Sequence, residues 1–126
     1  MARILVVDDV GSMRQIVRTV LESGRHRVLD ACSAEEALDL AKVTRVHLVL
    51  TDINMPGMGG LELIPQLRAL RTYRNTPIMI LAKGSADENL EQAMKRGASG
   101  WVEKPFTPEG LLGAVNQVLV DFYVNH

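Results

Sequence analysis

The chain has 126 residues, of which 47% are hydrophobic and 23% charged, and this composition is that of one globular domain rather than a disordered chain. A formal net charge of -1 gives no excess of positive charge, so the composition does not point to nucleic acid or an anionic membrane surface as a partner. The single cysteine, Cys32, excludes internal disulfides and thiolate zinc clusters. No apolar run is long enough for a membrane span or a secretory signal, so we expect a cytoplasmic protein.

Short apolar runs alternate along the chain with segments in which apolar residues follow helical spacing. The first run, Ile4 to Val7, is continuous and aliphatic, which is typical of a strand buried on both faces. In chain order, the expected strands cover residues 4–7, 28–29, 46–50, 78–81 and 100–103.

The predicted helices between these strands are recognised by the residues at their ends. Gly24 ends the first helix. Ser33 opens a Ser-Ala-Glu-Glu capping box for the second helix, and Ser85 opens a similar box for a fourth helix that runs to a glycine at position 97. Thr107, followed by a proline, begins the last helix. The third helix contains Pro65, which predicts a kink in its first turns.

Five strand–helix units in alternation predict a single α/β domain over residues 1–126, doubly wound, with a five-stranded parallel sheet and helices on both faces. In such sheets, ligands bind beyond the carboxyl ends of the strands, where the strand order reverses. The residues that follow each strand are therefore the candidates for a functional site.

Three carboxylates and a lysine follow the predicted strands. Asp8 and Asp9 come after the first strand, Asp52 after the third and Lys104 after the fifth. Each alone is an ordinary loop or turn residue, but their joint placement at one sheet edge indicates a site. Three neighbouring anions repel one another, and Mg²⁺, which prefers oxygen ligands, would relieve the repulsion. A metal and a lysine beside a carboxylate nucleophile suit the transfer of a phosphoryl group.

These residues, with their neighbours, resemble the receiver domain of bacterial two-component response regulators, and the stand-alone, CheY-like chemotaxis regulators in particular. The resemblance covers essentially the whole chain and implies the flavodoxin-like (βα)5 version of the fold. The matching motifs are Asp8-Asp9, Asp52-Ile53-Asn54-Met55-Pro56 with Gly60, Gly97-Ala98-Ser99-Gly100, and Lys104-Pro105-Phe106.

The resemblance implies a role for each residue of the acidic group. Asp52 would accept a phosphoryl group from a histidine kinase or a small phosphodonor. Asp9 would bind Mg²⁺ directly and Asp8 mainly through water, while Asp52 and the backbone carbonyl of Asn54 would complete the protein ligands.

The same resemblance assigns roles to residues of the fifth strand and the loop after it. Lys104 would contact the phosphoryl oxygens, and the Lys104-Pro105 bond would be cis. Trp101 would be the aromatic switch residue, turning between exposed and buried positions as the site changes state.

One position departs from the family pattern. Ala82 follows the fourth strand where the family has Thr or Ser, so the hydroxyl that donates to a phosphoryl oxygen is missing. We expect phosphorylation to persist and its coupling to Trp101 to weaken. Lys83, the next residue, either supplies a charge to the acidic pocket, in place of the metal or of the hydroxyl, or points into solvent.

The expected function is that of a monomeric, cytoplasmic, single-domain response regulator, which is phosphorylated and dephosphorylated but is not a turnover enzyme. Because the chain ends with the last helix, we expect output by protein contact, with the flagellar motor switch as the partner in chemotaxis-type relatives. Two alternatives stay open. One is a haloacid-dehalogenase-type phosphatase, although such enzymes carry their nucleophile on the first strand in an Asp-x-Asp motif. The other is a pseudo-receiver that only binds a partner, which the alanine at position 82 favours.

Overall fold

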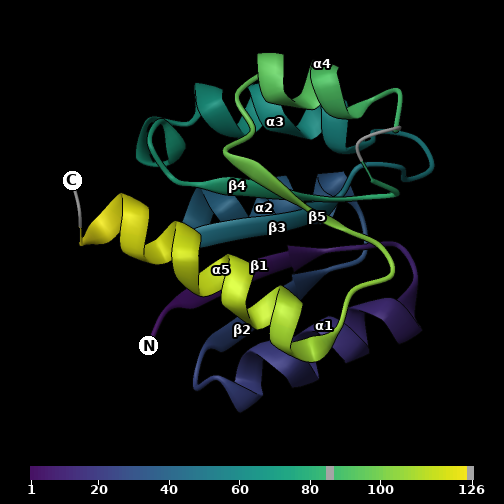
Figure 1. Ribbon diagram of the computed structural model, residues 1–126. Helices are drawn as coiled ribbons and strands as arrows, with labels where there is room; N and C mark the ends of the chain where they lie inside the picture. Colours follow the sequence, from purple (N-terminus) through teal and green to yellow (C-terminus); the bar gives the residue numbers. More distant parts are fainter. Residues whose placement is uncertain (85–86, 125–126) are drawn as a thin grey trace.

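The computed structural model describes residues 1–84 and 87–124. Its centre is a five-stranded parallel sheet in the order β2-β1-β3-β4-β5 (Figure 1). This confirms the predicted doubly wound α/β fold. The strands are β1 (Arg3–Val7), β2 (Arg27–Ala31), β3 (Leu48–Asp52), β4 (Ile78–Ala82) and β5 (Gly100–Glu103).

Helices cover both faces of the sheet. The helices are α1 (Gly11–Ser23), α2 (Ala34–Val43), α3 (Gly60–Ala69), α4 (Leu90–Lys95) and α5 (Pro108–Tyr123), with a short 3₁₀ helix, η1 (Arg71–Tyr73), after α3. Within the described part of the chain, no helix is both long and apolar enough to cross a bilayer.

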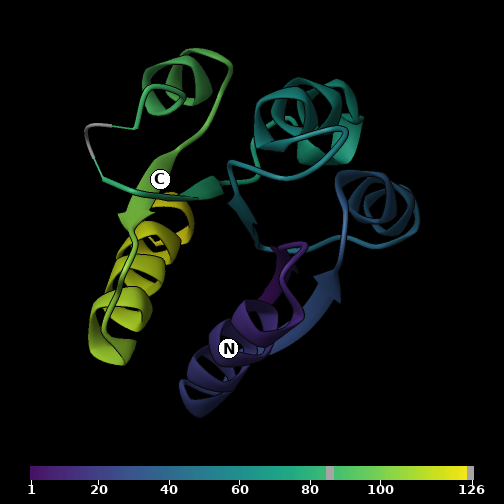
Figure 2. The ribbon, with the colours of Figure 1, turned by 90° about the vertical axis from the view of Figure 1, so that its right-hand side faces the viewer.

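Helices α1 and α5 lie on one side of the sheet and α2, α3 and α4 on the other (Figure 2), and a hydrophobic layer packs them against each face. One layer joins the sheet to α1 and α5, with Leu21 and Leu111 fully buried in it. The other joins the sheet to α2, α3 and α4, and contains Leu63 and Ala93. Because both faces are covered, β3 and β4 are buried along their whole lengths, as continuous apolar runs predict.

The predicted helix ends are confirmed at α1, α2 and α5. The hydroxyl of Ser33 accepts the backbone N–H of Glu36 at 3.1 Å, while the carboxylate of Glu36 accepts the N–H of Cys32 at 2.9 Å. At α5, the hydroxyl of Thr107 accepts the N–H of residue 110 at 2.9 Å. The bonds to the N–H groups of Glu36 and residue 110 satisfy donors that the first turn of a helix leaves without partners.

Several boundaries differ from the sequence-based prediction: β2 covers Arg27–Ala31 where 28–29 was expected, and two larger differences affect β3 and α4. The third strand was expected over 46–50, ending at Thr51-Asp52; it begins instead at Leu48 and includes Asp52 as its last residue. The fourth helix was expected from residue 85, and its predicted cap Ser85 lies outside the described residues. The described helix α4 begins only at Leu90. The Asp87 carboxylate accepts the backbone N–H groups of Lys83 and Asn89, which favours a turn over a helix at this point.

Pro65 lies inside α3, as the sequence predicted. Proline has no N–H to donate to the carbonyl four residues earlier, that of Leu61. The guanidinium of Arg96, from the end of α4, donates to this carbonyl at 3.0 Å. A bond from a second helix thus satisfies the acceptor that the proline leaves free.

Candidate functional site

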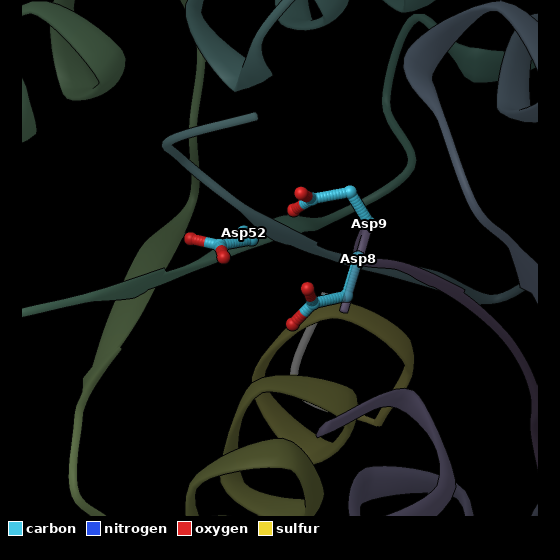
Figure 3. A group of neighbouring side chains, drawn as sticks. All are labelled: Asp8, Asp9 and Asp52. Atoms are coloured by element: carbon cyan, nitrogen blue, oxygen red, sulfur yellow. The ribbon is translucent and has the colours of Figure 1, made fainter. Parts of the chain in front are cut away.

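Three carboxylates meet at the carboxyl edge of the sheet. Asp8 and Asp9 directly follow β1, and Asp52 ends β3, which is the neighbour of β1 in the sheet. One oxygen of each carboxylate lies within 4.8 Å of the others (Figure 3). Because the strand order reverses between β1 and β3, the group lies at the position where such sheets bind ligands.

Asp8 is the most buried member of this group, with no exposed surface. Its Oδ1 accepts the backbone N–H of Val10 at 2.9 Å, whereas its Oδ2 has no hydrogen-bond partner among the described residues. Burial raises the pKa of Asp8 above its usual range, and the neighbouring charges of Asp52 and Asp9 raise it further, against the Val10 hydrogen bond and the charge of Lys104. A buried carboxylate oxygen without a donor, beside two more carboxylates, fits a bound cation.

Lys104 contacts Asp52 with its ammonium group. Its Nζ lies 3.2 Å from each carboxylate oxygen of Asp52. The Lys104 backbone N–H donates to the carbonyl of Ala82 at 2.7 Å, which ties the end of β5 to the end of β4. The Lys104-Pro105 peptide bond is cis, as the resemblance implied.

The loop after β3 is held close against Asp52. The backbone N–H of Asn54 donates to Asp52 Oδ1 at 3.3 Å. At Gly60, a Cβ atom would lie 2.7 Å from the backbone oxygen of Asp52, so only glycine allows α3 to begin this close to the strand end. This glycine therefore allows α3 to begin directly against the strand end that carries the Asp52 carboxylate.

Ala82 and Lys83 lie at the carboxyl end of β4 and Trp101 lies within β5; among the described residues, none of these three side chains bonds to the acidic group. Ala82 is buried at the end of β4 and presents only a methyl group. Lys83 is exposed and lines an open, polar cavity of about 330 Å³ together with Asn54, Asp87, Glu88 and Asn89. Trp101, in β5, is half-buried against the hydrophobic layer that contains α4.

Asn89 is a residue of this region that sequence reasoning missed. Its side-chain Nδ2 donates to Oδ1 of Asn54 at 3.1 Å, across 35 positions of the chain. The residues next to Asn54 and Asn89 in the sequence form no motif that indicates this contact, so it could not be predicted from local pattern.

Comparison with known proteins decides the family. The sequence model of the family 'response regulator receiver domain' matches residues 4–116 of this chain. This chain belongs to the response regulator receiver family. It is 38% identical over 119 residues to a chemotaxis protein CheY homologue of Campylobacter jejuni, which covers 93% of this chain and 92% of the relative. CheY4 of Vibrio cholerae superposes with a TM-score of 0.89 at 37% identity, covering 94% of this chain and 98% of that one. A receiver domain of a Francisella response regulator superposes with a TM-score of 0.85 at 28% identity, covering 96% and 98%.

These similarities support a CheY-like receiver domain of the two-component, chemotaxis type. Receiver domains of this kind accept phosphoryl groups from histidine kinases, contact output partners and generally bind Mg²⁺ in an acidic pocket. The group of Asp8, Asp9 and Asp52 has the oxygen donors for such an ion. The family match also counts against the phosphatase alternative, since Asp52 lies at the end of β3 rather than on the first strand.

Proposed function

We propose that this response regulator accepts a phosphoryl group on Asp52 from a histidine kinase, in a Mg²⁺-dependent step, and signals by contact with another protein. The observation that carries the proposal is the ammonium of Lys104, 3.2 Å from both oxygens of a buried Asp52 that has two further carboxylates beside it. This arrangement combines a nucleophile with the positive charge needed by the oxygens of a transferring group.

In the acceptor step, a carboxylate oxygen of Asp52 attacks phosphorus and the bond from phosphorus to the donor nitrogen breaks. The electron pair returns to the imidazole of the kinase histidine, which takes up a proton. The signal ends by hydrolysis of the acyl phosphate. Water attacks phosphorus, the bond from phosphorus to the Asp52 oxygen breaks, and the carboxylate and inorganic phosphate are released. We propose that this cycle switches the chain between two states and does not serve to consume a substrate, so the chain is not a turnover enzyme in the usual sense.

The residues that would hold Mg²⁺ are Asp9, Asp52 and the backbone carbonyl of Asn54, with Asp8 acting mainly through water. When bound, the ion supplies positive charge to the phosphoryl oxygens and offsets the repulsion among the carboxylates. The Lys104 ammonium supplies a second positive charge and orients Asp52. Burial of Asp52, whose residue surface is 5% exposed, limits access of water to the acceptor.

For Lys83, we propose an accessory role. It lines the cavity beside Asn54, from which its flexible side chain could bring a charge to the acidic group in the resting state. If it competes with the metal, Lys83→Ala strengthens Mg²⁺ binding. An unchanged Mg²⁺ affinity contradicts this role and leaves Lys83 as a solvent-exposed lysine.

Output would occur over the surface formed by α4, β5 and α5, where Trp101 lies, with the flagellar motor switch as the expected partner and the chain acting as a monomer. The methyl group of Ala82 cannot donate to a phosphoryl oxygen, and loss of a donor to a charged acceptor costs about 1.5–3 kcal/mol. We therefore expect the response of Trp101 to phosphorylation to be weaker than in a chain with Thr or Ser at this position.

Intact mass after incubation with acetyl phosphate and Mg²⁺ tests the proposal. We expect the mass of one phosphoryl group to be added to the wild-type chain, and no addition to Asp52→Asn or in the presence of EDTA. A wild-type chain that gains no mass, or an Asp52→Asn variant that gains as much, would refute the assignment of Asp52.

The pseudo-receiver alternative differs in its output. Ala82 favours this alternative because it removes one link between the site and the output surface. Beryllofluoride with Mg²⁺, followed by Trp101 fluorescence, separates the two. A spectral change indicates a working switch, whereas binding without any change indicates an occupied but uncoupled site.

A further inference from the structure

A side-chain hydrogen bond joins the acceptor loop to the start of α4. Asn89 Nδ2 donates to Asn54 Oδ1 at 3.1 Å. Asn54 belongs to the loop that follows Asp52, and Asn89 is the residue that precedes α4. The bond therefore links the loop that would supply a metal ligand to a helix of the proposed output surface.

At the helix end of this link, Asn89 is firmly attached to α4. Its carbonyl accepts the N–H of Ala93 at 3.0 Å, and its own N–H donates to Asp87 Oδ1 at 3.0 Å. Ala93 and Leu90 are both buried in the hydrophobic layer under α4. A displacement of Asn89 must therefore displace the first turn of the helix.

The side chain of Asn89 is not used by its own helix. Asparagine at this position ordinarily caps the helix by accepting a backbone N–H from the first turn. Here Asn89 has helical backbone angles (φ -90°, ψ -11°) and makes no such bond, and its amide reaches across to Asn54 instead. The contact is thus a bond between two loops, and its loss removes no cap.

At the acceptor end, Asn54 is bonded directly to Asp52. Its N–H donates to Asp52 Oδ1 at 3.3 Å, an oxygen that Lys104 also contacts. A phosphoryl group or a metal ion bound to Asp52 would change the charge on Oδ1, which accepts the Asn54 N–H. A metal ion would also fix the position of the Asn54 backbone carbonyl, which is one of its proposed ligands. The Asn54–Asn89 hydrogen bond gives such a change a path to α4 that does not involve the missing hydroxyl at Ala82.

We propose that Asn89 is a positioning residue that couples occupancy of the Asp52 site to α4 through Asn54. This inference rests on the proposed function, because it takes Asp52 and the Asn54 carbonyl as the groups that bind the ion. Coupling of this kind is reciprocal: if the Asn54–Asn89 bond favours the metal-bound loop, then metal binding favours the ordered start of α4.

The test measures Mg²⁺ affinity by calorimetry and hydrogen exchange of residues 90–96 with and without Mg²⁺. One net hydrogen bond corresponds to about a 2- to 12-fold change in an equilibrium constant, so we expect Asn89→Ala to weaken Mg²⁺ binding by about that factor. We expect Mg²⁺ to slow exchange in α4 of the wild-type chain and to leave exchange in Asn89→Ala unchanged. Gln92→Ala, an exposed amide on the same helix, is the matched control and should behave as wild type.

Two further variants separate coupling from a general loss of structure. Asn54→Ala combined with Asn89→Ala should weaken Mg²⁺ binding no more than either alone, because both remove the same bond. Asn89→Asp can accept from a rotated Asn54 amide, so it should restore the Mg²⁺-dependent exchange of α4. Additive losses in the double variant, or no recovery in Asn89→Asp, contradict the proposal.

The outcomes also separate the inference from the proposed function. If the wild-type chain binds Mg²⁺ and gains phosphoryl mass, while Asn89→Ala matches Gln92→Ala in affinity and in α4 exchange, only the coupling role of Asn89 is refuted. If the wild-type chain neither binds Mg²⁺ nor gains mass, the proposed function fails and the inference falls with it.

Discussion

Replacing Asp8 by Asn should stabilise the metal-free protein. Asp8 is fully buried, and its Oδ2 has no hydrogen-bond donor among the described residues. An Asn side chain keeps an oxygen for the N–H of Val10, which Asp8 Oδ1 accepts at 2.9 Å. Its NH₂ group replaces the unpartnered oxygen and can donate to the carboxylates of Asp9 or Asp52, which lie within 4.8 Å.

The expected gain follows from the cost of an unsatisfied buried acceptor. Such a group costs about 1–3 kcal/mol, so the free energy of unfolding of Asp8→Asn should exceed that of wild type by about that amount. The gain should depend on pH. The pKa of Asp8 is raised in the folded protein from its ordinary value of 3.8, mainly by burial. Between the ordinary and the raised value, the folded state binds more protons than the unfolded state, so this group makes stability fall as pH rises.

The advantage of Asp8→Asn should therefore be small at acid pH and should widen as pH rises above 3.8 through the raised pKa, then stay constant. Urea unfolding in EDTA at several pH values measures it as a shift in midpoint at constant slope. Saturating Mg²⁺ should reverse the order of stabilities, because wild type binds the ion more tightly. Asp39→Asn, an exposed position on α2, is the control and should change stability by less than about 0.5 kcal/mol. A metal-free Asp8→Asn protein that is no more stable than wild type at neutral pH would show that burial of this charge is not the dominant cost.

Three further substitutions test other contacts of the site. Lys104→Ala removes both contacts of the ammonium group to Asp52. It should slow phosphorylation by acetyl phosphate about 10- to 100-fold, measured as intact mass against time. An unchanged rate would exclude the ammonium group from the transfer step. Ala82→Thr supplies the missing hydroxyl and should enlarge the Trp101 fluorescence response to beryllofluoride, at a cost of about 1–3 kcal/mol in urea unfolding for the added volume; an identical fluorescence response would contradict the role of the hydroxyl. Gly60→Ala places a Cβ 2.7 Å from the Asp52 carbonyl and should destabilise the fold by about 1–3 kcal/mol and weaken Mg²⁺ binding in calorimetry, whereas a neutral effect would mean that α3 shifts freely.

Much of the fold could be predicted because its signals are local. Continuous apolar runs indicated the strands, and helical spacing with Ser33 and Thr107 at the caps indicated the helices. The start of α4 could not be predicted in this way, because the Asp87 carboxylate bonds to nearby backbone N–H groups in competition with a helix. The start of β3 at Leu48, two residues later than expected, was missed as well, since an apolar run does not mark where strand pairing begins.

The candidate site was partly predictable for a related reason. Asp8, Asp9, Asp52 and Lys104 follow strands, and parallel strands end at one edge, so their convergence follows from the order of elements alone. Their identity as a receiver site came from the spacing of the motifs, which the family match over residues 4–116 supports. Neither source indicated which carboxylate would be buried without a partner.

The amino-acid sequence alone specified five strand–helix units and the chemical groups at their ends, because strand and helix periodicity and the order of residues are properties of neighbouring positions. Tertiary packing specified the distances: it set β1 beside β3, buried Asp8, and brought Asn89 within 3.1 Å of Asn54. It also placed the Arg68 guanidinium 2.7 Å from the backbone carbonyl of Gly97, 29 positions further along the chain. Such contacts join residues far apart in the chain, and they depend on how all the helices pack on the sheet together, which no local pattern encodes.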